Sequence, residues 1–261
     1  MATATELFRA GRLQAAIDAQ VQDVKAHPAD SGKRVFLFEL LAFAGDLDRA
    51  RRHLDAVTYP DPDRDAAAQQ YRTLLDAEDH RARVFRDGVM PEFLIPAPDW
   101  VYPRLEAVNA LRAGRPADAK ALLDKSDADA APVNRTLNGQ PVEGLRDCDD
   151  LFGPVLEVLA HGGYYWLPLE QLDGLTANPP KYPRDLIWFP VKLAVKDGPA
   201  GDAFLPARYP LTADASDALK LGRATDWRQD AGGPVRGVGL RLFLAGDDAV
   251  PLTELRELTA G

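Results

Sequence analysis

The sequence is poor in the side chains from which disulfides and metal sites are built. Its 261 residues include one cysteine, Cys148, and four histidines, His27, His53, His80 and His161. A single cysteine excludes an internal disulfide and a cysteine-based zinc cluster. No two histidines have the i, i+4 spacing that places two metal ligands on one face of a helix. We therefore expect neither a metal site nor a cofactor.

Long hydrophobic runs and dense clusters of positive charge are also missing. No segment approaches the ~20 apolar residues that a membrane-spanning helix needs, and the N-terminal residues lack the basic start and apolar stretch of a signal peptide. The formal net charge is −9, and no run of lysine and arginine is dense enough to follow a phosphate backbone. We therefore expect a soluble, cytoplasmic protein that binds neither nucleic acid nor membrane.

Three segments share a Gly-x-[Leu/Pro]-x-x-Ala pattern, beginning at Gly11, Gly45 and Gly114. The first two glycines lie 34 residues apart, the period of tetratricopeptide repeats, and the next interval of 69 residues is close to two periods. In such hairpins, glycine ends the first helix in a left-handed conformation and the small alanine lets the second helix pack closely. The pattern predicts helical hairpins, with a further helix over about 65–86 where one unit has lost its glycine.

The chain changes character after the third hairpin. With 46% hydrophobic and 27% charged residues it should fold throughout, and its length suits one large domain or two modest ones. Four prolines exclude regular helix over 91–103, and residues 126–131 are small, polar and acidic. We predict a linker there, between a tetratricopeptide-like helical domain over 1–125 and an α+β domain over 132–261.

Short strand-like runs and turns alternate in the second half. The Asn138-Gly139 dipeptide is a strong hairpin signal. Because turns rather than long crossover helices join the runs, the sheet should be mostly antiparallel. The predicted fold class is α+β multidomain, with an N-terminal array of tetratricopeptide-like α-α hairpins followed by a mostly antiparallel α+β domain. Strands are predicted over 164–167, 186–195, 204–209 and 237–244, and short helices over 151–159 and 252–258.

The acidic cluster from Arg146 to Asp150 has two interpretations. A metal or acid-base site is one, but adjacent residues do not converge well on one ion and the calcium-loop spacing is absent. In the other, Asp149 or Asp150 caps a helix that starts near Leu151. Cys148 is a poor nucleophile because the neighbouring carboxylates disfavour its thiolate. We prefer the helix cap and an inert thiol.

Two glycine-containing segments suggest catalysis only weakly. His161-Gly162-Gly163 resembles an oxyanion loop, but no Gly-x-Ser-x-Gly elbow supplies a nucleophile, so we predict a turn that ends a helix. The run over 232–239 matches neither the dinucleotide fingerprint nor the phosphate loop and is predicted as a loop. A hydrolase or regulatory enzyme, the alternative function, would need convergent titratable groups in a pocket of the second domain. The candidates are Asp149, Asp150, His161 and Asp226.

Large apolar and aromatic side chains are the candidate protein-binding residues. Such side chains serve both cores and interface hot spots, and a tetratricopeptide array has a concave face suited to a helix or an extended peptide. Core packing is the alternative for each of them. The predicted contacts are Leu37, Phe38, Leu41, Trp166, Trp188 and Trp227.

Several segments together carry a family resemblance: Arg34–Leu41, Ala44–Ala50, Arg146–Asp150, Leu156–Leu159, Tyr164–Pro168, Pro183–Trp188, Leu205–Pro210 and Leu221–Trp227. Through them the sequence resembles the ImpE/SciE family, also called TagJ, of accessory proteins encoded in bacterial type VI secretion clusters. The last three segments are the most distinctive. The resemblance implies a non-enzymatic adaptor that binds the N-terminal helix of the small sheath subunit. It also implies an indirect link between the contractile sheath and its ClpV unfoldase.

Overall fold

The first half of the chain folds into helical hairpins, as the glycine pattern predicts. The structure, a computed structural model, describes residues 2–260. Gly11, Gly45 and Gly114 have φ angles of 76°, 80° and 67°, in the left-handed region that glycine enters without steric cost. The alanine of each motif is fully buried. The helices are α1 (Ala4–Arg9), α2 (Leu13–Ala26), α3 (Ser31–Ala44), α4 (Leu47–Asp55), α5 (Pro62–Asp87), α6 (Val101–Arg112) and α7 (Pro116–Asp129).

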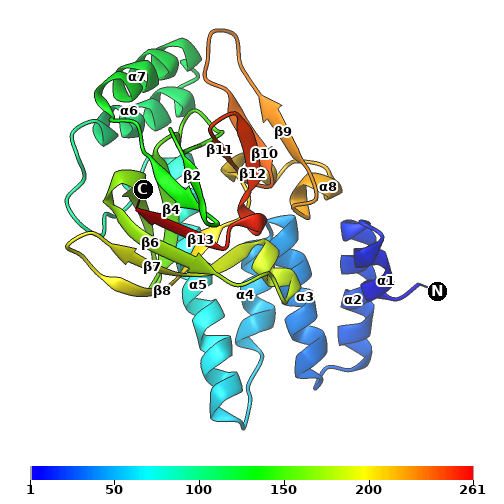
Figure 1. Cartoon of the computed structure of the whole chain (residues 1–261). Coiled ribbons are helices and arrows are strands. Elements are labelled where there is room, and N and C mark those ends of the chain that lie inside the picture. The colour runs from blue at the N-terminus through cyan, green and yellow to red at the C-terminus, as the bar shows by residue number, and fades with distance from the viewer. Residues whose placement is uncertain (1, 261) are drawn as a thin grey trace.

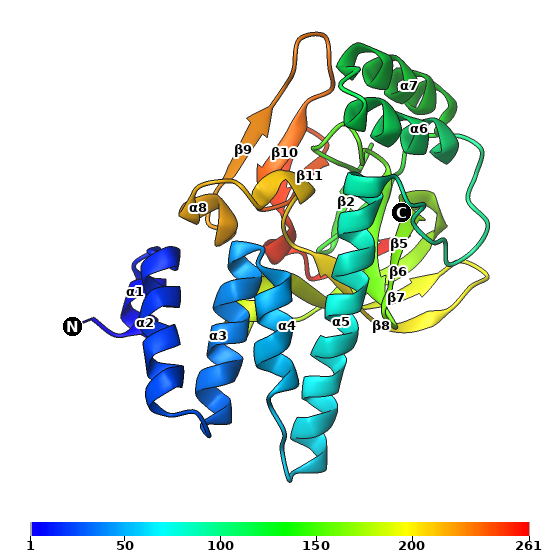
Figure 2. The ribbon, with the colours of Figure 1, turned by 180° about the vertical axis from the view of Figure 1, so that it is seen from behind.

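Helices α1 to α5 lie side by side and form what we call the helical array (Figures 1 and 2). Helix α5 fills the position of the unit without glycine and extends from the array to the strands, where it packs on β4 (Val155–Ala160) and β5 (Gly163–Pro168). The third hairpin, α6 and α7, lies at the far end of α5 and does not continue the stack. Helix α6 begins before Pro103, which is tolerated in a first turn.

The second half, which we call the sheet region, contains one large antiparallel sheet and two small ones. Its further elements are β1 (Arg135–Leu137), β2 (Gln140–Val142), β3 (Arg146–Asp147), η1 (Leu169–Gln171), β6 (Leu172–Ala177), η2 (Pro183–Leu186), β7 (Trp188–Val195), β8 (Ala200–Pro206), η3 (Pro210–Thr212), α8 (Asp217–Lys220), β9 (Thr225–Arg228), β10 (Arg236–Gly239), β11 (Leu242–Ala245), β12 (Asp248–Pro251), η4 (Leu252–Glu254) and β13 (Glu257–Ala260). The large sheet has the order β2-β1-β13-β6-β7-β8-β4-β5, and its neighbouring strands pair antiparallel. The predicted fold class is confirmed.

Two tight turns show how local sequence sets the pairing of strands. Asn138 and Gly139 have φ angles of 51° and 82° and join β1 to β2, so the predicted hairpin is confirmed. Both angles are positive, as a type I′ turn requires. His161 and Gly162 have nearly the same angles, 49° and 82°. They join β4 to β5, so this turn connects two strands and does not end a helix.

Both short helices predicted in the second half are wrong. Residues 151–159 form a turn followed by β4, which is buried on both faces. Such a strand lacks polar alternation, and periodicity alone cannot distinguish it from a buried helix. Within 252–258 only η4 is helical, and β13 follows, paired with both β1 and β6. Partners distant in the sequence decide this conformation, so a local pattern could not reveal it.

Two predicted strands have different limits in the structure. The strand over 237–244 is divided into β10 and β11, because Gly239 has a φ of 90° and turns the chain between them. Its run of alternating apolar residues concealed this break. The glycine-rich run over 232–239, predicted as a loop, ends in β10. The strand over 204–209 is the end of β8, which starts earlier and stops before the predicted limit.

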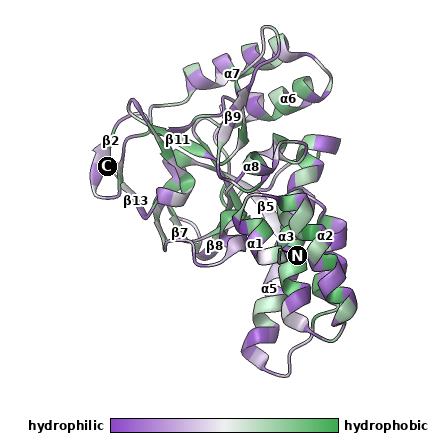
Figure 3. Ribbon diagram, turned by 90° about the vertical axis from the view of Figure 1, so that its right-hand side faces the viewer, coloured by the Kyte–Doolittle hydropathy of each residue, from purple (hydrophilic) through white to green (hydrophobic). Residues whose placement is uncertain are grey.

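The hydrophobic core crosses the predicted boundary between the two domains. One cluster of buried side chains unites the helices with Phe152, Tyr164 and Trp188 of the sheet region, and a second lies within the sheet region. The predicted linker over 126–131 starts as the last turn of α7, and buried Ser126 anchors it by donating a 2.7 Å hydrogen bond to a backbone carbonyl of α6's N-cap. The helices carry both hydrophobic and hydrophilic residues (Figure 3), and no helix within residues 2–260 is long and apolar enough to cross a membrane.

Candidate functional site

A buried network of charges connects α5 to the sheet region. The side chain of Glu157, on β4, is fully buried. It accepts hydrogen bonds from Arg81 of α5, at 2.7 and 3.1 Å, and from the Tyr164 hydroxyl at 2.5 Å. Arg241, between β10 and β11, makes a second ion pair with the same carboxylate. Because a buried carboxylate is costly unless it is paired, these contacts hold α5 on β4.

The acidic cluster near β3 lies in buried ion pairs and does not cap a helix. Asp147 pairs with Arg241 and accepts a 2.9 Å hydrogen bond from the Tyr209 hydroxyl. Asp149 accepts two hydrogen bonds from Nε of Arg236, at 2.8 and 3.0 Å. Burial raises the pKa of Asp147 to about 6, against the opposing effect of Arg241. The cluster therefore joins β3 to β10 and β11.

The sheet region supplies charged caps to three helices of the array. Arg208 donates to two carbonyl oxygens in the last turn of α3, at 2.7 and 3.1 Å. Arg223 donates to two carbonyl oxygens at the end of α1, at 2.8 and 3.1 Å. Asp217 accepts a 2.8 Å hydrogen bond from the backbone nitrogen of Leu13, the first residue of α2. Each charge has the sign that its helix end favours, and each satisfies an unpaired backbone group.

The segment from η2 to β7 also contacts the array. Arg184 donates to Glu39 of α3 at 2.5 Å. The indole nitrogen of Trp188 donates to Glu78 of α5 at 3.0 Å, and its ring stacks on Phe38 of α3 with a centroid distance of 6.0 Å. The distinctive segments named in the sequence thus contain many of the residues that hold the array in place.

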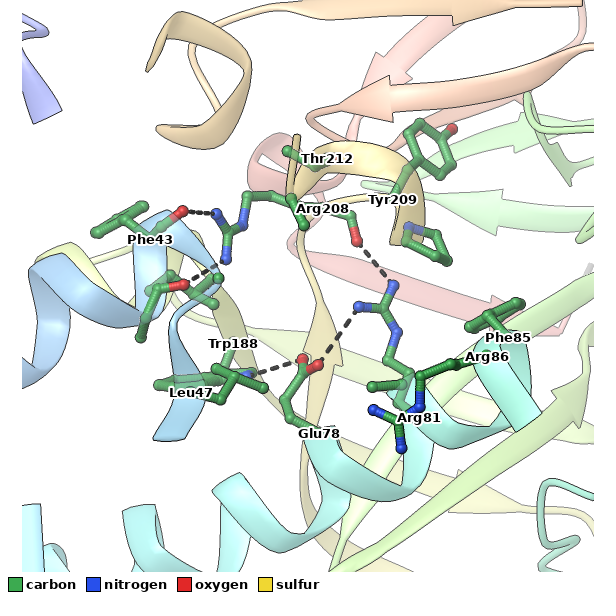
Figure 4. A pocket seen from close by; sticks show the side chains of 16 residues that line it. Phe43, Leu47, Glu78, Arg81, Phe85, Arg86, Trp188, Arg208, Tyr209 and Thr212 are labelled. Atoms are coloured by element: carbon green, nitrogen blue, oxygen red, sulfur yellow. Dashed lines mark hydrogen bonds and ion pairs between the residues drawn. The ribbon is translucent and has the colours of Figure 1, made fainter. Parts of the chain in front are cut away.

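A pocket of about 340 Å³ opens where the array meets the sheet region, and we call it the junction pocket (Figure 4). Its walls come from the α3–α4 turn, α5 and η3. Three arginines and one glutamate line it, together with apolar side chains such as Trp188. Figure 4 shows Arg208 directed toward the end of α3, and Arg81 between Glu78 and the Arg208 carbonyl. Burial lowers the pKa of Arg208 to about 10.

A second pocket, of about 260 Å³, lies within the array and is called the array groove here. It is lined by Phe38 of α3, Ala67 and Tyr71 of α5, Tyr59 and Arg184. The guanidinium of Arg184 lies 4.7 Å from the centroid of the Tyr71 ring. A residue of the sheet region thus forms part of the lining of this groove.

Most of the predicted protein-binding residues belong to the core. Leu37, Phe38, Leu41, Trp166 and Trp188 are at most 1% exposed, so in this conformation a partner cannot cover much of their surface. The alternative interpretation, packing in the core, fits these five residues. Trp227 on β9 is 41% exposed and its ring lies 6.1 Å from that of Tyr209. It remains an accessible candidate.

The residues proposed for an enzyme do not form one cluster. Asp149 is buried against Arg236, whereas Asp150 pairs with Arg146 at 3.3 Å. His161 is exposed in the β4–β5 turn, and Asp226 is exposed on β9. Among residues 2–260, no group of three or more histidine, cysteine, aspartate or glutamate side chains is arranged to hold a metal ion.

The one thiol lies in the same acidic cluster. Burial raises the pKa of Cys148 to about 11, and the charge of Asp147 adds to this effect. Its thiolate is therefore disfavoured, in agreement with the prediction of a poor nucleophile.

The residues that build the junction were not predicted from the sequence. Arg81, Glu157, Arg208 and Arg241 were not singled out, although three of them are charged residues inside otherwise apolar runs. Charged side chains are rarely buried unless they are paired. An isolated charge in an apolar run is thus a signal for a buried ion pair, but the partner cannot be identified from one sequence.

Comparisons with known proteins agree with the resemblance seen in the sequence. Residues 139–259 match the family described as "ImpE protein". The chain is 39% identical over 257 residues to a Pseudomonas aeruginosa protein named "Type VI secretion system accessory component TagJ", an alignment that covers 98% of this chain and 90% of that protein. A crystal structure of a Vibrio parahaemolyticus protein is similar to 98% of this chain, with a TM-score of 0.91 and 24% identity, and it supports the fold. From the identity across nearly its whole length, the chain belongs to the ImpE/TagJ family.

Proposed function

We propose that this protein is a non-catalytic, cytoplasmic adaptor of a type VI secretion system. Its partner would be the N-terminal helix of the small sheath subunit, and through that subunit it would link the sheath to the ClpV unfoldase. The observation that carries this proposal is the 39% identity to the accessory component TagJ over 98% of the chain.

Features of the structure support an adaptor. Pockets of about 340, 370 and 260 Å³ border the array. Each is large enough for an apolar side chain of a partner, and helix capture rests on a few such anchors. The charged residues at the junction pair with one another or with backbone groups, which is the arrangement of a scaffold.

Isothermal titration calorimetry tests the proposal. The ligand is a synthetic peptide covering the N-terminal helix of the cognate small sheath subunit, and the control is a scrambled peptide of the same composition. Saturable binding of the native peptide alone, with a Kd of about 10 μM or tighter, is the expected result. Equal binding of both peptides, or no binding of either, would contradict the proposal.

A further inference from the structure

A smaller pocket continues the junction pocket toward α6. It has a volume of about 200 Å³ and is lined by Val108 and Leu111 of α6. Phe85 and Pro210 line both pockets, so the two pockets adjoin. Leu211, which is 36% exposed, stands at the rim. We call the surface formed by the two adjoining pockets, between α5, α6 and η3, the junction groove.

The junction groove is rich in arginine although the whole chain carries a net charge of −9. Glu78 is the single acidic residue among the lining residues of the two pockets. Three of the arginines form ion pairs: Arg81 with buried Glu157, Arg236 with buried Asp149, and Arg86 with exposed Asp87. The five lining arginines are Arg81, Arg86, Arg112, Arg208 and Arg236.

Two further arginines of the groove form no ion pair with any of residues 2–260. Arg112 donates to the backbone carbonyl of Arg86 at 3.0 Å and to the Asn109 amide oxygen at 2.9 Å. Arg208 donates only to backbone carbonyl oxygens. Asp87 lies near Arg112 and Glu78 lies near Arg208, in each case without forming an ion pair with it, so each guanidinium can also attract a carboxylate of a partner. The groove thus combines apolar pockets with positive charge.

We infer that the junction groove is the surface that receives the partner helix, an inference that rests on the proposed function. The matching segment is amphipathic, with one apolar anchor for each pocket and a carboxylate placed to reach Arg112. Anchors of this kind recur at i, i+3 or i+4 on a bound helix. Charge complementarity selects this occupant, because the groove is positive on an acidic protein.

The array groove is the competing site. It has no acidic lining residue and is lined by two arginines. Arg184 is paired with Glu39 and stacked on Tyr71, whereas Arg64 is exposed near the start of α5. Helix α5 lines both grooves, with Ala82 in the junction groove and Ala67 in the array groove. The same substitution at these two positions on one helix therefore distinguishes the sites.

The test measures fluorescence anisotropy of the labelled sheath-subunit peptide with wild-type protein, Ala82→Trp and Ala67→Trp. Filling the junction groove should weaken binding at least about tenfold, whereas Ala67→Trp should change the Kd less than about twofold. Arg112→Gln, a substitution at an exposed residue, should weaken binding about three- to tenfold. A peptide in which glutamine and asparagine replace glutamate and aspartate should bind the wild type more weakly by a similar factor. Its affinity should not change further in Arg112→Gln. Circular dichroism melting curves verify that each variant is folded.

The outcomes separate this inference from the proposed function. If the wild type binds the peptide and both Ala82→Trp and Arg112→Gln bind it equally well, the groove assignment is wrong while the adaptor stands. Loss of binding in Ala67→Trp alone would place the helix in the array groove and overturn the inference. If the wild type does not bind the peptide, the proposed function fails, and this inference fails with it.

Discussion

The helical array and the sheet region place their charges differently. Within the array, most ion pairs include an exposed side chain, as between Arg51 and Asp76, whose side chains are 36% and 59% exposed; the pair between Glu78 and Arg81 is buried. In the sheet region, the side chains of Asp147, Asp149 and Glu157 are fully buried in ion pairs. Exposed pairs contribute little to stability, whereas breaking a buried pair is expensive. Apolar packing and caps therefore hold the array, whereas the sheet region combines an apolar core of its own with buried long-range charge pairs.

Both helix caps and buried ion pairs occur at the boundary between the two regions. Arg208 and Arg223 are residues of the sheet region that cap helices of the array, and Arg81 is a residue of the array that enters the buried network. Helix ends without partners leave backbone groups unsatisfied. The array thus obtains part of its stability from the sheet region, and the two should unfold together.

Replacing Glu157 with alanine should cause the largest loss of stability. The variant leaves Arg81 and Arg241 buried without the carboxylate that they share. Breaking such a pair costs about 3–5 kcal/mol, measured as the free energy of unfolding in urea. Glu106→Ala, at an exposed residue of α6, is the control and should change the free energy of unfolding by less than about 0.5 kcal/mol. Equal effects of the two substitutions would remove the contrast between buried and exposed charge.

Substitution of Arg208 should have the next largest effect. Alanine at this position removes the hydrogen bonds to the last turn of α3, and hydrogen bonds to charged groups contribute about 1.5–3 kcal/mol. Arg208→Lys keeps the charge but not the forked geometry, so it should reduce stability less than Arg208→Ala does. Hydrogen exchange should increase at the C-terminal end of α3. Unchanged exchange there would show that the cap is not stabilising.

Asp217→Ala tests a cap at the N-terminal end of a helix, α2. The substitution removes the acceptor for the backbone nitrogen of Leu13, and the loss of an N-terminal cap costs about 1 kcal/mol. Asp214→Ala, at an exposed residue of the same segment, should have an effect below about 0.5 kcal/mol. Chemical denaturation of both variants gives the comparison. A smaller effect for Asp217 than for Asp214 would rule out the cap.

Arg51→Ala should have the smallest effect of the four. The pair between Arg51 and Asp76 is exposed, so its loss should change stability by less than about 0.5 kcal/mol. The difference should become smaller still at 1 M salt, where exposed charges are screened. A loss above about 2 kcal/mol would mean that surface pairs stabilise the array, contrary to the comparison.

The helical half could be predicted because its signals are local. The motifs at Gly11, Gly45 and Gly114 each combine a left-handed glycine with a small alanine at a fixed offset, and both features act within one hairpin. The Asn138-Gly139 turn could be predicted equally well, because these two residue types favour positive φ angles. The positions of α6 and α7 relative to the array could not be read from the repeat.

The sheet region and the site were harder because distant partners decide them. Strand β13 forms between β1 and β6, so its local sequence was misassigned to a helix. The candidate site was only partly visible: Trp188 and Phe38 were singled out, but as surface contacts, because helical spacing does not tell a groove from a core. The pairing of Glu157 with Arg81 and Arg241 requires three distant segments to meet.

Equilibrium unfolding followed by two probes tests most directly whether the array and the sheet region form one unit. Circular dichroism at 222 nm reports mainly the helices. Tryptophan fluorescence reports mainly the buried Trp100, Trp166 and Trp188, which belong to the core that the helices share with the sheet region. A shared core and shared caps predict coincident urea transitions with the same midpoint and slope. Two separate transitions, with fluorescence preserved while helix is lost, would contradict the account and show that the sheet region stands without the array.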